Sequence, residues 1–263
     1  MTLETCTKVN VGLNVLRKRA DGYHDLETLF VPYYGYSDLL TVEPSERLDI
    51  DIEREGGVDW DPMEDLTVRA WRLLKADYPQ LPAVSIHLEK RAPVGAGLGG
   101  GSADAAFMLR ALNELGGLGL DDPALAAYAS RLGSDCAFFI YCRPMFATGR
   151  GEILEPFDID LSKYTLKVEI PTCADGKPVA VSTREAYGGI VPRELWGEDV
   201  FPPLRDALRL PVEEWRGRVV NDFESTVCPL HPEISELIAD FYARGAVYAA
   251  MSGSGSSVFG LFL

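Results

Sequence analysis

Alternation of apolar and polar residues is clearest near the N-terminus, between residues 8 and 15. Valine and leucine at the odd positions alternate there with a lysine, two asparagines and a glycine. A period of two is typical of a half-buried β-strand, so one face of this segment is predicted to enter the core. The other face would carry Lys8, Asn10, Gly12 and Asn14 away from it.

The rest of the chain mixes the periods of strands and helices. Strand-like pieces occur in residues 38–53, 84–89, 166–170 and 258–263. Helical spacing of apolar residues occurs in residues 66–78, 102–119, 123–131, 183–187 and 234–242. This mixture predicts an α/β fold. A polar, glycine-rich stretch at residues 149–151 predicts two halves, residues 1–150 and 151–263.

Length and charge narrow the classes of function. The chain has 263 residues, 47% of them apolar, which is enough for one or two packed domains. Forty acidic residues against 25 basic ones give a formal net charge of −15. Such a field repels nucleic acids and anionic membranes, so neither is expected as a partner. A phosphate would have to be captured by short-range donors, such as backbone amides, a helix N-terminus or a divalent cation.

The cysteines and the first residues of the chain indicate the cellular compartment in which the protein is expected. Five cysteines at scattered spacings, without a C-x-x-C pair and with only three histidines, indicate neither a disulfide framework nor structural zinc. No stretch reaches the roughly 18 apolar residues of a transmembrane helix. Residues 1–7 lack the charged start and apolar run of a secretory signal. The protein is therefore expected to be cytoplasmic.

The strongest chemical signal is the segment P-V-G-A-G-L-G-G-G-S, which leads into an alanine-rich helical run. Residues without side chains let backbone N–H groups approach an anion, and a helix N-terminus adds partial positive charge. Ser102 stands where the helix N-cap is expected, and capping is compatible with a phosphate contact. The predicted phosphate site consists of Pro93, Gly95, Gly97, Leu98, Gly99, Gly100, Gly101 and Ser102.

This segment differs from two familiar glycine-rich loops. The P-loop is absent because no lysine precedes Ser102. The dinucleotide fingerprint is matched formally by Gly95, Gly97 and Gly100, with an aspartate about 20 residues further on. That fingerprint should directly follow a buried strand, whereas the strand at residues 84–89 is amphipathic and several residues intervene. A phosphate loop of another kind is therefore favoured.

The motif P-x-G-x-G-L-G-G-G-S-A-D-A-A resembles the second motif of the galactokinase, homoserine kinase, mevalonate kinase and phosphomevalonate kinase (GHMP) superfamily. Other segments resemble, in order, those of the 4-diphosphocytidyl-2-C-methyl-D-erythritol kinase family: Lys8-Val-Asn10, Asp21-Gly-Tyr-His24, Leu132-Gly-Ser-Asp135, Asn221-Asp-Phe-Glu224 and Met251-Ser-Gly-Ser-Gly-Ser256. D-G-Y-H is the most specific of them, because the glycine loop is shared by the superfamily. One departure is Glu64-Asp65, where the family usually has an asparagine on the adenine side.

The resemblance implies the two-domain GHMP kinase fold, with an ATP-binding N-terminal half and a ferredoxin-like substrate half. It implies ATP- and Mg²⁺-dependent phosphorylation of the 2-hydroxyl of a cytidine diphosphate sugar alcohol, 4-diphosphocytidyl-2-C-methyl-D-erythritol, in the non-mevalonate isoprenoid pathway. Asp135 is then expected to take the hydroxyl proton, with Lys8 beside it. From the residues alone, a turn or cap role is favoured for Asp135 over a catalytic one. A monomer or weak homodimer is expected, and metal ligands are not identified.

The resemblance also implies a cytosine site. Tyr23 and His24 pair a stacking ring with a hydrogen-bonding ring, which suits a pyrimidine. T-R-E-A-Y, which ends at Tyr187, resembles the segment whose aromatic residue closes over the base, so Thr183 and Tyr187 are expected to contact substrate. Asn10 is assigned to the substrate as well. Three alternatives stay open: a superfamily kinase with another acceptor, a nicotinamide oxidoreductase, and a binding protein without turnover.

Overall fold

The computed structural model of the protein describes residues 1–196 and 202–263. These residues form two compact units, each with its own elements. Unit 1 contains Met1–Thr7, Pro32–Val94 and Gly99–Cys142, and unit 2 contains Lys8–Val31, Gly95–Leu98 and Arg143–Leu263. The glycine-rich loop therefore contributes residues to both units. The boundary expected near residue 150 stays a prediction.

Unit 1 contains a four-stranded sheet. Its order is β1 (Thr2–Glu4), β4 (Leu39–Ser45), β6 (Ala83–Lys90), β5 (Asp49–Arg54). β4 runs antiparallel to both of its neighbours, whereas β5 runs parallel to β6. The alternation predicted for β6 is confirmed, because Val84, Ile86 and Leu88 are buried while the side chain of His87 is 43% exposed.

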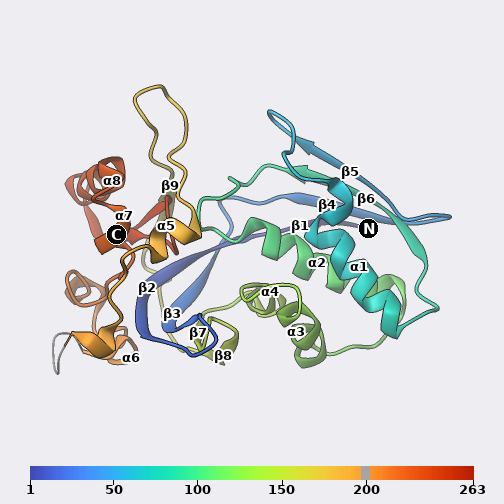
Figure 1. Cartoon of the computed structure of the whole chain (residues 1–263), viewed down its shortest axis with the longest axis horizontal. Coiled ribbons are helices and arrows are strands. Elements are labelled where there is room, and N and C mark those ends of the chain that lie inside the picture. The colour runs from blue at the N-terminus through green and yellow to red at the C-terminus, as the bar shows by residue number, and fades with distance from the viewer. Residues whose placement is uncertain (197–201) are drawn as a thin grey trace. The chain divides into compact units, whose positions relative to one another are not determined.

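Helices complete unit 1: η1 (Pro62–Glu64), α1 (Leu66–Asp77), α2 (Gly100–Leu115), α3 (Asp122–Ser130) and α4 (Cys136–Tyr141). Two starts are capped, since Asp65 accepts the N–H of Thr67 at 2.9 Å and Asp121 accepts that of Ala124 at 3.0 Å. Helix α1 lies alongside α2 (Figure 1). The buried face of α2 carries alanines, whose small side chains leave room for neighbouring elements. The first three helices predicted from the sequence are confirmed to within a few residues.

Three ionisable side chains are buried together in unit 1. The Lys90 ammonium, at the end of β6, donates to Oδ2 of Asp38 and, at 2.6 Å, to Oδ2 of Asp104 on α2. The three side chains are 4%, 0% and 2% exposed. Burial raises the pKa of Asp104 to about 8, even though the Lys90 ammonium opposes that shift. One ammonium group thus donates hydrogen bonds to two buried carboxyl groups.

Replacing Asp104 by asparagine is expected to stabilise the protein increasingly as the pH rises. The carboxyl titrates near 3.9 in an unfolded chain, so the wild type loses stability through Asp104 between about pH 4 and 8, whereas an amide does not titrate. Between pH 5 and 8 the difference in free energy of unfolding should move on the order of 3 kcal/mol in favour of the variant. Urea unfolding at several pH values measures it, and a pH-independent difference would contradict the expectation.

Two sheets belong to unit 2, apart from the last residues of β3 and the first of β2. One has the order β2 (Thr7–Lys18), β3 (His24–Tyr33), β7 (Met145–Thr148), β8 (Ile153–Pro156), and the other β10 (Ala246–Met251), β11 (Val258–Phe262), β9 (Thr165–Glu169). The helices are α5 (Thr183–Tyr187), η2 (Arg193–Leu195), α6 (Leu204–Ala207), η3 (Val212–Glu214), α7 (Glu224–Val227) and α8 (Pro232–Ala243). Ile234 and Phe241 of α8 share a buried cluster with Met251 and Val258. The strands and helices predicted in this part of the chain are confirmed.

The polar face predicted for β2 is not exposed, and that prediction is wrong. Lys8, Asn10 and Asn14 are all 3% exposed or less. Helix α6 covers part of this face so closely that a Cβ added at Gly12 would lie 2.5 Å from Cδ1 of Leu204. The sequence around α6 has no readable period, so this cover was not predictable from it.

Candidate active site

Left-handed backbone shapes the glycine-rich loop. Gly95, Gly97 and Gly99 have φ angles of +75°, +77° and +74°, which cost a residue with a Cβ about 1–2 kcal/mol. Helix α2 begins at Gly100, and Gly99 takes the N-cap position without a side-chain cap. The expectation that Ser102 is the N-cap is therefore wrong, because Ser102 is the third residue of the helix. A helix start without a side-chain cap suits an anionic ligand.

Lys8 contacts this loop within unit 2. Its Nζ donates to the backbone oxygen of Gly97 at 2.8 Å and to Oδ1 of Asn10 at 2.5 Å. Its backbone N–H donates to the oxygen of Leu98 at 3.0 Å. The ammonium also lies 5.3 Å from the ring centre of Phe30. The structure thus brings Lys8, Asn10 and the middle of the glycine loop together around one buried cation.

A second loop, residues 252–257, packs against the first within unit 2. Ser252 Oγ accepts the backbone N–H of Asn10 at 3.1 Å, and Ser257 donates its N–H to the oxygen of Ala96 at 3.2 Å. Ser252 was not among the predicted site residues, although the M-S-G-S-G-S motif marked its loop.

Alanine at Gly97 is expected to damage the loop far more than alanine at Gly95. Both residues have positive φ, but a Cβ at Gly97 would lie 2.6 Å from the backbone oxygen of Ser252 and 2.9 Å from that of Gly255. A Cβ at Gly95 would meet nothing within 4 Å. Gly95→Ala should cost about 1–2 kcal/mol of stability. The sequence-based expectation is that this loop holds ATP phosphates; on that expectation Gly97→Ala should also weaken ATP binding at least about 10-fold, because the two loops must separate.

Denaturant unfolding and titration with a non-hydrolysable ATP analogue check this pair of variants. The same conformational strain is present in both, so the difference between them isolates the close approach of the second loop. Equal effects of the two substitutions on nucleotide affinity would contradict the expectation.

Asp135 belongs to unit 1, at the start of α4. It takes the N-cap position without a side-chain cap bond, and Ser134 Oγ donates to its Oδ1 at 3.3 Å. Asp135 thus occupies a turn and cap position through its backbone, whose oxygen accepts the N–H of Phe138 at 3.2 Å, and not through a side-chain cap bond. Lys8 belongs to unit 2, so the two predicted catalytic residues are each described within their own unit.

The predicted cytosine contacts separate into two groups within unit 2. The rings of His24 and Tyr187 are stacked, with centroids 4.9 Å apart and planes at 23°. Tyr187 ends α5 and Thr183 begins it, with Thr183 exposed. Tyr23 is 58% exposed, and the guanidinium of Arg150 lies 4.9 Å from its ring centre. Arg150 was not predicted, and only its place in the polar G-R-G stretch hinted at it.

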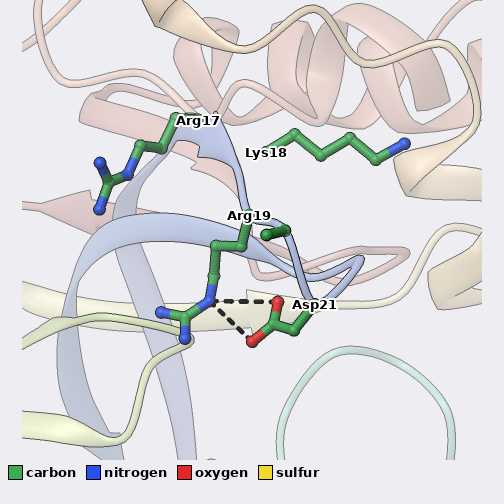
Figure 2. Close-up of a pocket in the computed structure, with 5 residues that line it drawn as sticks. Arg17, Lys18, Arg19 and Asp21 are labelled. Carbon is green, nitrogen blue, oxygen red and sulfur yellow. Dashed lines mark hydrogen bonds and ion pairs between the residues drawn. The ribbon is translucent and has the colours of Figure 1, made fainter.

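The turn before Tyr23 is fixed by ion pairs. The end of β2 and this turn line a hollow of about 450 Å³ with Arg17, Lys18, Arg19, Ala20 and Asp21. Arg19 Nε donates to both carboxylate oxygens of Asp21, at 3.0 and 3.2 Å (Figure 2), and Asp21 accepts the N–H of Tyr23 at 3.1 Å. Partial burial, aided by Lys18, lowers the pKa of His24, so its ring is mainly neutral at pH 7. A neutral imidazole both donates and accepts hydrogen bonds.

Within residues 1–196 and 202–263, no helix is long and apolar enough to cross a membrane. Nor do three His, Cys, Asp or Glu side chains of these residues come together in a way that would hold a metal ion.

Comparison with known proteins identifies the family. The model for the GHMP kinases N terminal domain matches residues 65–143, and that for the GHMP kinases C terminal matches residues 205–263. The chain is 45% identical to the 4-diphosphocytidyl-2-C-methyl-D-erythritol kinase of Azobacteroides pseudotrichonymphae over 97% of its length and 91% of that protein. It is 47% identical to the 4-diphosphocytidyl-2-C-methyl-D-erythritol kinase of Parabacteroides distasonis, over 97% of this chain and 89% of that protein. The chain belongs to the family of 4-diphosphocytidyl-2-C-methyl-D-erythritol kinases within the GHMP kinases.

Solved structures agree with this family. A crystal structure of 4-(cytidine 5'-diphospho)-2C-methyl-D-erythritol kinase, 36% identical, superposes with a TM-score of 0.77 and covers 99% of this chain and 90% of that one. The Methanococcus jannaschii mevalonate kinase has a TM-score of 0.67 at 13% identity, covering 100% of this chain and 90% of that one, and shows the fold alone. The predicted α/β GHMP kinase fold is thereby confirmed.

Proposed function

We propose that this GHMP kinase transfers the γ-phosphoryl group of ATP to the 2-hydroxyl of 4-diphosphocytidyl-2-C-methyl-D-erythritol, giving the 2-phosphate and ADP in the non-mevalonate isoprenoid pathway. The observation that carries the proposal is the contact of buried Lys8 with the glycine loop, in a chain 45–47% identical to kinases named for this acceptor. The reaction is assigned to the cytoplasm, with small molecules as the ligands.

Asp135 is proposed to accept the proton of the 2-hydroxyl, and Lys8 to stabilise the charge that develops on the hydroxyl oxygen. A cation beside the reacting hydroxyl would favour the negative charge that develops on its oxygen. Phosphoryl transfer depends more on positioning and on such charge stabilisation than on full proton removal, because its transition state is loose.

The glycine loop is proposed to hold the ATP phosphates. Three glycines with positive φ and a helix start without a side-chain cap offer backbone N–H groups at close range, which suits a protein whose net charge is −15. Mg²⁺ is proposed to enter with the nucleotide, and when bound it neutralises part of the phosphate charge. Lys8 then positions the loop through Gly97 as well as acting at the reacting oxygen.

The cytosine ring is proposed to bind where His24 and Tyr187 stack. A base that replaces the contact between these rings would have one aromatic face against Tyr187, while the neutral His24 supplies hydrogen bonds. Tyr23 would add a second stacking surface, and Thr183 and Asn10 are proposed as polar contacts to the rest of the acceptor. Arg150 restricts the rotation of the exposed Tyr23 ring through its cation–π contact.

ADP release with Mg²⁺-ATP tests the proposed function. The wild type should turn over 4-diphosphocytidyl-2-C-methyl-D-erythritol but not 2-C-methyl-D-erythritol 4-phosphate, which lacks the cytidylyl group. Turnover of both compounds at similar kcat/KM would point to another acceptor within the superfamily. A folded protein that binds NADH and not ATP would instead support the oxidoreductase alternative.

A further inference from the structure

A single aspartate lies at the entrance to the glycine loop in unit 1. Asp38 directly precedes β4, and its side chain is 0% exposed. One carboxylate oxygen, Oδ1, accepts the backbone N–H groups of Arg91 and Ala92 at 2.6 and 2.7 Å. Its other oxygen, Oδ2, accepts the ammonium of Lys90. Asp38 therefore holds three consecutive residues at the point where β6 ends and the loop begins.

The far end of the loop meets the same charged group. Lys90 also donates to Asp104, which lies on the first turns of α2. A Cβ added at Gly100, the first residue of that helix, would lie 3.5 Å from Oδ2 of Asp38 and 3.6 Å from Cβ of Ala92. The two ends of the loop thus come together on one buried carboxylate.

We propose that Asp38 is a positioning residue for nucleotide binding, which fixes both ends of the phosphate loop so that its backbone N–H groups are aligned before ATP arrives. This inference rests on the proposed function, because it assumes that the loop binds ATP phosphates. Asp38 does not touch the reacting atoms in this account. It acts through the backbone of residues 91 and 92 and through Lys90.

A carboxylate is needed at this position because both of its oxygens accept hydrogen bonds: one from the Lys90 ammonium and the other from the two backbone N–H groups. Asparagine keeps the shape but replaces one oxygen with an NH₂ group, which would face either the Lys90 ammonium or the two backbone N–H groups. In either orientation a buried donor is left unsatisfied. The entrance of the loop should then shift, and the cost should appear in nucleotide binding.

Titration of the full chain with a non-hydrolysable ATP analogue tests the inference. Asp38→Asn is expected to bind the analogue at least about 10-fold more weakly, with KM for the alcohol acceptor changed less than about threefold. The matched control is Asp121→Ala, which removes the cap of α3 in the same unit and lowers stability without touching the loop. Its nucleotide affinity should equal that of the wild type. A folded Asp38→Asn with wild-type affinity would overturn the inference.

Hydrogen exchange on the wild type covers the case in which Asp38→Asn does not fold. The amides of Arg91 and Ala92 should already exchange slowly without nucleotide, because the carboxylate holds them in the free protein. Rapid exchange of both amides until nucleotide is added would contradict prior positioning. A wild type that binds no ATP analogue would overturn the proposed function and this inference together, whereas the other outcomes concern Asp38 alone.

Discussion

Asp135→Asn is expected to lower kcat by about 100- to 10,000-fold, the range that a positioned general base contributes. Asparagine keeps the size of the side chain but cannot accept the hydroxyl proton at neutral pH. Asp135 takes the N-cap position of α4, where asparagine is as favourable as aspartate, so the variant should fold with little loss of stability. Steady-state ADP release measures kcat, and thermal unfolding measures stability. A fall in kcat of less than about 10-fold would remove Asp135 from the proton-transfer role.

Lys8→Met extends this prediction to the cation. Methionine keeps most of the buried side-chain volume but removes the donor to Gly97 and Asn10. If Lys8 and Asp135 act on the same hydroxyl, the double variant should be little slower than the worse single variant, because groups that act as a unit have strongly non-additive effects. Fully multiplicative losses would mean that the two residues act in separate steps. The cycle therefore measures kinetically whether residues described in different units share one site.

The pattern of apolar and polar residues predicts a helix or strand well when the residues within that element determine its structure. Helix α1 carries its N-cap at Asp65 and an apolar stripe, and β6 alternates over its full length, so both were predicted nearly to the residue. The burial of β2 was not predictable in this way. Its second face is covered by residues around Leu204 that are almost 200 positions away and have no period of their own. Long-range cover of this kind leaves no signal in the strand itself.

Sequence motifs select candidate site residues, but they do not predict the contacts between those residues. The glycine loop indicated a phosphate site, but the helix start at Gly100 depends on the left-handed backbone of Gly99, and serine propensity favoured Ser102 instead. Asp38 is not predicted from the sequence, because its proposed role depends on three donors on a segment more than fifty residues away. Such roles arise from tertiary structure. The sequence indicates at Asp38 only the start of a strand-like segment.

A buried ion pair in unit 2 carries the largest expected effect on stability. Arg193 donates through Nε to Oδ2 of Asp222 at 2.9 Å and through Nη2 to Oδ1 at 2.7 Å. Oδ2 also accepts the backbone N–H of Val15 on β2 at 2.8 Å. The side chains of Arg193 and Asp222 are 14% and 0% exposed. Removing the carboxylate would take two hydrogen bonds from a largely buried guanidinium and the acceptor from a strand N–H.

Asp222→Ala is therefore expected to lower the free energy of unfolding by about 3–5 kcal/mol, the usual cost of removing one partner from a buried pair. The matched control is Glu169→Ala on β9, whose carboxylate is also held by two nitrogens of one arginine, Arg244, at 2.8 and 3.2 Å. Those side chains are about 40% exposed, so the control should lose no more than about 1 kcal/mol. Chemical denaturation of both variants measures the difference. Equal losses would show that water already solvates the Arg193–Asp222 pair, which would contradict its burial beneath β2.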